Sequence, residues 1–193
     1  MYFTPVSGDG LCKHFYKGIL EDDIRDIFLT YYSIVNPRIV GTVEDIAYLR
    51  HTDGIIRFYD KDDNLLGWAI QETKRDIGLD SVQVPRAFLQ AIMYLANVYY
   101  DTNPLGLDNF KGIFLDSKRY FCYITKEELD PVMELFEPLW EKYYRVRPSD
   151  AFRVPDLEDF IPIALHKIRF KHYQFNEKFN LDQFIKDLYE NNI

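Results

Sequence analysis

The stretch TDGIIRFYDKDDNLLGWAIQETK, residues 52–74, decides the fold expected for this chain. Its first nine residues are rich in isoleucine and aromatic side chains, DKDDN is a polar turn, and LLGWAIQETK resumes the apolar pattern. Two such runs joined by a polar turn predict an antiparallel β-hairpin over 53–74.

The second strand of this hairpin carries charged residues where its apolar face ends. Side chains alternate along a strand, so Trp68, Glu72 and Lys74 share one face. Asp53 begins the first strand, and antiparallel pairing brings it to the Glu72 end of the second. The hairpin therefore predicts that two carboxylates and an ammonium group converge at the edge of a cleft.

Helical patterns lie on both sides of the hairpin. Apolar residues recur at helical spacing over 19–35, and a further helical turn is expected over 42–50. Pro85 is placed to open a helix that continues to Tyr100. The stretch 127–146 is also helical in pattern, with two prolines that predict a helix start and a kink or break.

A second pair of strands is expected after the Pro85 helix. KGIFLDSKRYFCYI (111–124) predicts two short strands joined by a turn at Asp116-Ser117, or one strand with a bulge. A strand, helix, strand passage favours parallel pairing, whereas the hairpin is antiparallel. The expected fold class is therefore α/β, with a mixed β-sheet flanked by helices and a helical C-terminal extension.

Composition limits the classes of protein to which the chain can belong. With 193 residues, 47% of them hydrophobic, it can bury one sizeable core. Short apolar runs and the lack of a signal-peptide pattern predict a soluble protein without a membrane partner. Cys12 and Cys122 have no metal-ligand spacing, which fits a reducing cytoplasm. A net charge of −8 argues against a domain that grips nucleic acid unaided.

The converging charges at the hairpin end have a definite chemistry available. Two carboxylates with water suit Mg²⁺, and Mn²⁺ as its substitute, when a substrate phosphate completes the coordination. Such a metal polarises a phosphoryl group and lowers the pKa of a bound water. Lys74 can then orient that water or stabilise charge on the phosphorus. The expected reaction is hydrolysis of a phosphodiester.

Asp53, followed nineteen residues later by Glu72-Thr73-Lys74, resembles the signature of the PD-(D/E)xK nuclease superfamily. The sequence departs from that signature at Thr52, where a proline is usual. The resemblance implies a restriction-endonuclease-like fold, in which Asp53 and Glu72 bind metal and Lys74 completes the catalytic set.

Three further features extend the resemblance to the N-terminal nuclease domains of type I-like and single-chain type IIG restriction-modification enzymes. Gln90 and Tyr94 match the QxxxY motif of that subset, which implies that they position DNA. Glu21, in EDDIRDIFL, matches an acidic helix that adds a metal ligand, although Asp22, Asp23 and Glu44 are rivals. The stretch 111–124 resembles the strand and turn that follow the QxxxY helix.

The resemblance also implies a domain division and a set of partners. Residues 1–124 would form the nuclease core, and 125–193 a helical extension or connector to a following domain. The implied partners are double-stranded DNA and a methyltransferase or specificity domain in the same or another chain. Two alternatives stay open: a nuclease-like module without activity, favoured by the acidic composition, and an enzyme acting on RNA or a small phosphoester.

Overall fold

The computed structural model describes residues 19–43, 52–74, 83–100, 106–117, 120–168, 171–174 and 181–192. Its α-helices are α2 (Glu21–Val35), α3 (Gln83–Tyr100), α4 (Lys126–Tyr143), α5 (Pro155–Lys167) and α6 (Leu181–Asn192). Two short 3-10 helices are η1 (Leu107–Asn109) and η2 (Pro148–Arg153). The strands are β1 (Ile39–Thr42), β2 (Gly54–Tyr59), β3 (Leu65–Thr73), β4 (Phe110–Asp116), β5 (Tyr120–Thr125) and β6 (Lys171–Gln174).

The six strands form one mixed sheet in the order β1-β2-β3-β4-β5-β6. Among the described strands, only β3 and β4 pair in parallel; the other neighbouring strands are antiparallel. Helix α3 connects the two parallel strands, as a parallel connection requires. The predicted α/β class, with a mixed sheet flanked by helices, is confirmed.

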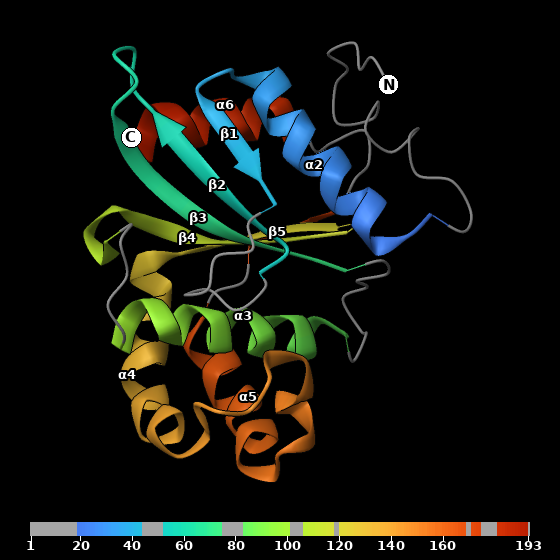
Figure 1. The fold of residues 1–193 in the computed structure, drawn as a ribbon, viewed down its shortest axis with the longest axis vertical. Helices are drawn as coiled ribbons and strands as arrows, with labels where there is room; N and C mark the ends of the chain where they lie inside the picture. The colour runs from blue at the N-terminus through green and yellow to red at the C-terminus, as the bar shows by residue number, and fades with distance from the viewer. Residues whose placement is uncertain are drawn as a thin grey trace.

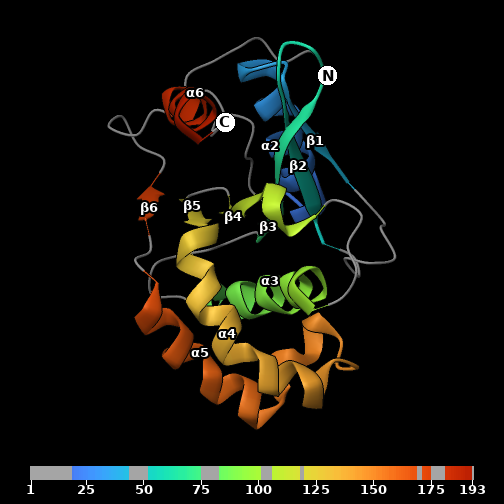
Figure 2. The ribbon, with the colours of Figure 1, turned by 90° about the vertical axis from the view of Figure 1, so that its left-hand side faces the viewer.

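Helices cover both faces of the sheet (Figures 1 and 2), with α2 and α6 on one side and α3, α4 and α5 on the other. Each face has its own hydrophobic core. The α3-side core contains residues such as Ile70, Phe88 and Phe136, and the α2-side core contains Phe58 and Phe114 among others. Both faces of β3 are therefore buried, which accounts for its nearly continuous apolar sequence.

The hairpin forms as predicted. In the polar turn, the Asp60 carboxylate accepts hydrogen bonds from the backbone N–H groups of Asp62 and Asn64, both at 2.8 Å. Asp63 adopts a left-handed conformation, with φ of 62°, which suits an aspartate in a tight turn. A register shift between Phe58 and Tyr59 separates this turn from the rest of the ladder, in which Gly54 comes opposite Gln71 at the far end of the hairpin.

Two expectations outside the hairpin are corrected. Thr42 does not begin a helical turn, because it pairs with Ile55 as the last residue of strand β1; positions 44–50 of that expectation lie outside the described residues. Helix α4 is continuous from Lys126 to Tyr143 with Pro131 and Pro138 inside it, so neither proline starts the helix or breaks it.

The C-terminal part beyond Thr125 contains more than helices. Strand β6 pairs with β5, so it extends the same sheet. Helices α4 and α5 contribute to the α3-side core, and Leu181 and Ile185 of α6 to the α2-side core. Among the described residues, none of the helices is both long and apolar enough to cross a membrane.

Candidate active site

The strands β2 and β3 bring Asp53 and Glu72 together at one end of the sheet. Gly54 pairs with Gln71, so Asp53 comes opposite Glu72 one step further along the antiparallel pair. The backbone N–H of Thr73 donates a 2.7 Å hydrogen bond to Asp53 Oδ2, which fixes the Asp53 carboxylate against β3. Glu72 is buried at 1% exposure, between the buried polar residues Gln71 and Thr73 at the end of β3.

Lys74 joins the predicted acidic residues into one cluster. Its Nζ lies 2.6 Å from Glu72 Oε1, 3.3 Å from Glu21 Oε1 and 3.9 Å from Asp53 Oδ2. The distance between any two of these three carboxylate oxygens is therefore at most the sum of their two distances to Lys74 Nζ. The structure thus brings Glu21, Asp53, Glu72 and Lys74 to one place, although Glu21 comes from α2 and the others from the hairpin.

The rivals of Glu21 are placed differently. Asp22 and Asp23 are exposed, and Asp22 forms a 3.0 Å ion pair with Arg25 on the same helix. Glu44 lies outside the described residues. Glu21 is therefore the acidic residue of this helix that contacts Lys74.

The cluster carries more negative charge than one ammonium group neutralises. Burial, and then the neighbouring Asp53 charge, raises the pKa of Glu72 to about 8, against the lowering effect of Lys74. Burial also raises the pKa of Asp53, again partly offset by Lys74. For Lys74 the burial works toward a lower pKa, but Glu72 and Asp53 outweigh it and raise the pKa above its usual value. Lys74 therefore stays protonated at neutral pH.

One oxygen of this cluster has no partner among the residues that the structure describes. Glu72 Oε2 is buried and accepts no hydrogen bond from any of them, which is costly for a carboxylate. Within the described residues, no group of three or more Asp, Glu, His or Cys side chains is arranged to hold a metal ion. Mg²⁺ needs only one or two carboxylates besides water and a substrate phosphate. Asp53 and Glu72, with the unpartnered Glu72 oxygen, fit that smaller requirement.

Helix α3 carries Tyr94 and Gln90, the two residues of the predicted QxxxY motif. Tyr94 is buried at 6% exposure, and Gln90, one turn earlier on the helix, is partly exposed. Burial, followed by the charges of Glu72 and Asp53, raises the pKa of the Tyr94 hydroxyl. Tyr94 belongs to the α3-side core, which also contains Trp68 and Ile70 of β3.

Asp116 is a buried carboxylate that the sequence interpretation treated only as part of a turn. It pairs in parallel register with Thr73, and its oxygens accept hydrogen bonds from Thr73 Oγ1 (2.5 Å), Gln71 Nε2 (2.7 Å) and the Tyr32 hydroxyl (3.0 Å). The Asp116 carbonyl also accepts from the backbone N–H of Lys74 at 2.9 Å. Asp116 therefore holds the end of β3 from the face opposite Glu72.

A sequence signal for Asp116 exists. It is a single carboxylate that ends an apolar strand, and strands that run parallel end at the same edge of a sheet. Once β4 is recognised as parallel to β3, this rule places Asp116 beside Thr73. The register itself depends on how α3 crosses the sheet, which local pattern does not reveal.

Comparisons of this chain with models of protein families, with curated proteins and with solved structures found no match. The geometry and electrostatics of the cluster around Lys74 are therefore the basis for a functional assignment.

Proposed function

We propose that this chain is a Mg²⁺-dependent DNA endonuclease domain of a restriction-modification system, with a restriction-endonuclease-like fold. The observation that carries the proposal is the convergence of Asp53, Glu72 and Lys74 at the end of one hairpin, with the Lys74 ammonium within 3.9 Å of both carboxylates. Apart from β1, which lies between α2 and the hairpin, the order of helix, hairpin, helix and parallel strand is the one implied by the resemblance.

The two carboxylates would hold the metal ion. When bound, Mg²⁺ or Mn²⁺ would supply Lewis acidity to a phosphoryl oxygen and increase the acidity of a bound water. Asp53 is fixed by its bond to the Thr73 N–H, and Glu72 by burial and by Lys74, so both are held in position before substrate arrives. Glu21 lies on the solvent side of the cluster, where it can contact the ion through water.

Lys74 would act through its positive charge rather than as a base. Its raised pKa keeps it protonated at neutral pH, so it can donate hydrogen bonds but cannot accept a proton. A protonated amine beside the scissile phosphate can hold an attacking water or stabilise the negative charge of the transition state. Tyr94 and Gln90, on one face of α3, would position the DNA strand next to this group.

A plasmid-nicking assay tests the proposal. Lys74→Ala removes the ammonium group, and we expect the rate of nicking in Mg²⁺ to fall by about 100-fold or more, as for other transition-state donors. The matched control is Lys61→Ala, since Lys61 is an exposed lysine in the hairpin turn. Circular dichroism would establish that both variants fold. Nicking by Lys74→Ala at the wild-type rate would contradict the assignment. Parallel hydrolysis assays with RNA and nucleotide substrates would define the substrate class.

A non-catalytic nuclease-like module is the second candidate, and one observation favours it. Lys74 already neutralises part of the charge that a metal ion would neutralise, and its Nζ lies among the three carboxylates. Calorimetric titration with Mg²⁺ and Mn²⁺ separates the two candidates. Saturable binding that disappears in Asp53→Asn supports the enzyme, whereas no heat of binding in the wild-type protein supports the module.

A further inference from the structure

A cavity of about 570 Å³ opens between the C-terminal end of α3 and helix α4. Its lining consists of four aromatic and two acidic residues: Tyr99, Tyr100, Glu137, Trp140, Glu141 and Tyr144. None of these residues belongs to the cluster around Lys74. The cavity is therefore a separate feature.

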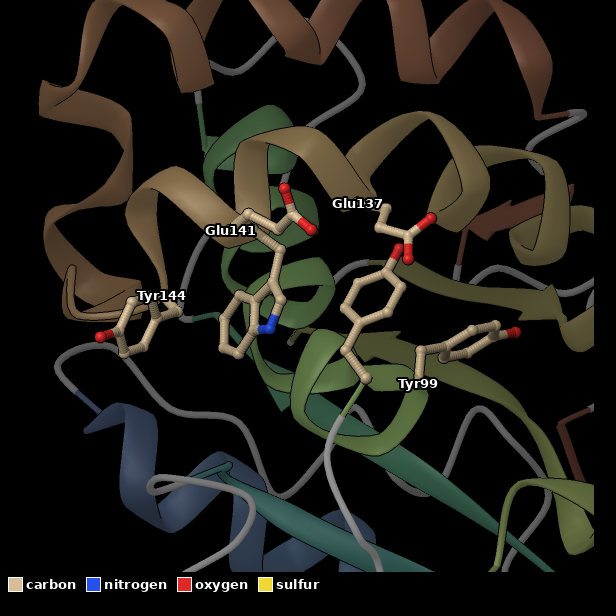
Figure 3. A pocket seen from close by; sticks show the side chains of 6 residues that line it. Tyr99, Glu137, Glu141 and Tyr144 are labelled. Atoms are coloured by element: carbon tan, nitrogen blue, oxygen red, sulfur yellow. The ribbon is translucent and has the colours of Figure 1, made fainter.

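The aromatic rings of this cavity form a continuous row. The ring centroids of Tyr100 and Trp140 are 6.3 Å apart, and those of Trp140 and Tyr144 are 6.4 Å apart. Figure 3 shows Tyr144 and Tyr99 at opposite ends of the lining, with Glu137 and Glu141 between them. The two glutamates lie one helical turn apart on α4, so their carboxylates border the same stretch of the row.

The hydroxyl groups at the α3 end are already engaged. The Tyr99 hydroxyl donates to Asp130 Oδ1, and the Tyr100 hydroxyl donates to the carbonyl oxygen of Met133. What these tyrosines contribute to the cavity is therefore mainly ring surface. Burial, and then the charges of Glu137 and Glu134, raises the pKa of Tyr100, which indicates a negative potential at this ring.

Ring surface and carboxylates together favour a cation. The face of an aromatic ring is electronegative and attracts a positive charge, and the carboxylates of Glu137 and Glu141 add direct attraction. The same two carboxylates repel phosphate, so the row is unsuited to stacking a nucleic-acid base with its backbone. The protein's net charge of −8 adds a long-range attraction for cationic partners.

A guanidinium group suits this lining better than an ammonium group. It is planar, stacks on aromatic rings, and donates paired hydrogen bonds to a carboxylate. Rings of this protein already carry cations of both kinds, since the Arg86 guanidinium carbon lies 4.1 Å from the centroid of Phe152 and Lys142 Nζ lies 4.8 Å from that of Tyr143. At the cavity itself the cation over a ring is a guanidinium group, because the Arg145 guanidinium carbon lies 5.3 Å from the centroid of Tyr144. We propose that the cavity between α3 and α4 binds an arginine side chain of a partner protein.

Tryptophan fluorescence gives a direct test on the intact chain. The protein has two tryptophans, and Trp68 is fully buried, so a ligand in the cavity would change the emission of Trp140. We expect a blocked tetra-arginine peptide to shift this emission saturably, and a tetra-lysine peptide to bind more weakly. Equal binding of tetra-lysine would contradict the preference for guanidinium, and a response to a single-stranded oligonucleotide in place of the peptide would overturn the proposal.

Charge-removing variants locate the response in the cavity. Glu137→Gln combined with Glu141→Gln keeps the shape of the lining, and we expect the dissociation constant of tetra-arginine to rise about tenfold. The matched control combines Glu158→Gln with Asp159→Asn, which removes two exposed charges from α5 outside the cavity. If the control pair weakens binding as much as the cavity pair, the attraction is general and the proposed site is wrong.

Discussion

At the scale of one residue, burial of Glu72 in the site lowers the free energy of unfolding at neutral and higher pH. Its pKa is raised from about 4.5 to about 8 in the folded protein. Between these values the folded state holds a proton that the unfolded state has released. The free energy of unfolding therefore falls as pH rises through this interval, because the unfolded chain binds fewer protons there. This is the cost of keeping a carboxylate where a cation can bind it.

The substitution Glu72→Gln tests whether ionisation of Glu72 makes the free energy of unfolding fall as pH rises. The amide resembles the protonated carboxyl group and cannot ionise, so the variant should lose less stability than the wild-type protein as pH rises from about 5.5 to about 8.5. Urea unfolding at both pH values measures the difference, and the other ionisable groups are common to both proteins. A constant difference at the two pH values would contradict the raised pKa of Glu72.

Asp116 acts on the site through the backbone and side chains of β3. It accepts three side-chain hydrogen bonds, so Asp116→Asn places an amide N–H where a donor already points. We expect the free energy of unfolding to fall by about 1–3 kcal/mol, the usual cost of an unsatisfied buried group. If Asp116 positions Lys74, kcat for nicking should fall more than KM changes. The exposed Asp62→Asn is the control, and its stability should match the wild-type value.

At the scale of elements, sequence patterns predicted the helices and the hairpin, which are stabilised by contacts between residues close together in the chain. The hairpin over 53–74 and helices α2 and α3 follow from periodicity and from turn residues such as those around Asp60. Strand β1 was missed because four residues carry too little pattern, and its pairing with β2 stabilises it. Local sequence patterns do not predict the parallel register of β3 with β4. They therefore do not predict the position of Asp116 beside Thr73 either.

Helix α4 begins with a capping box formed by Thr125 and Glu128. Thr125 Oγ1 accepts from the Glu128 backbone N–H at 3.4 Å, and Glu128 Oε2 accepts from the Thr125 N–H at 3.1 Å. Thr125→Ala should lower the free energy of unfolding by about 1 kcal/mol, because a backbone donor loses its acceptor. Urea unfolding measures this, and Thr125→Ser should retain most of the stability. Equal losses in both variants would indicate a role for the threonine methyl group instead of the cap.

For the whole molecule, the position of the site between two cores matters most. Lys74 and its carboxylates lie at the end of a sheet whose faces are both covered, so the groups are desolvated by packing that extends far beyond them. Helices from the C-terminal part, after Thr125, contribute to both cores. The raised pKa values of Glu72 and Asp53 are therefore a property of the complete fold, and a cation that relieves them should stabilise that fold as a unit.

Thermal unfolding with and without Mg²⁺ tests this coupling. At about pH 6.5 Glu72 holds a proton that the metal has to displace, whereas at about pH 8.5 the carboxylate is largely ionised and ready to bind. The increase in Tm on adding Mg²⁺ should therefore be larger at the higher pH. Asp53→Asn removes one of the two ligands and should abolish the increase, while NaCl at equal ionic strength controls for screening. An increase of the same size at both pH values, or one that persists in Asp53→Asn, would place the bound cation elsewhere on the protein.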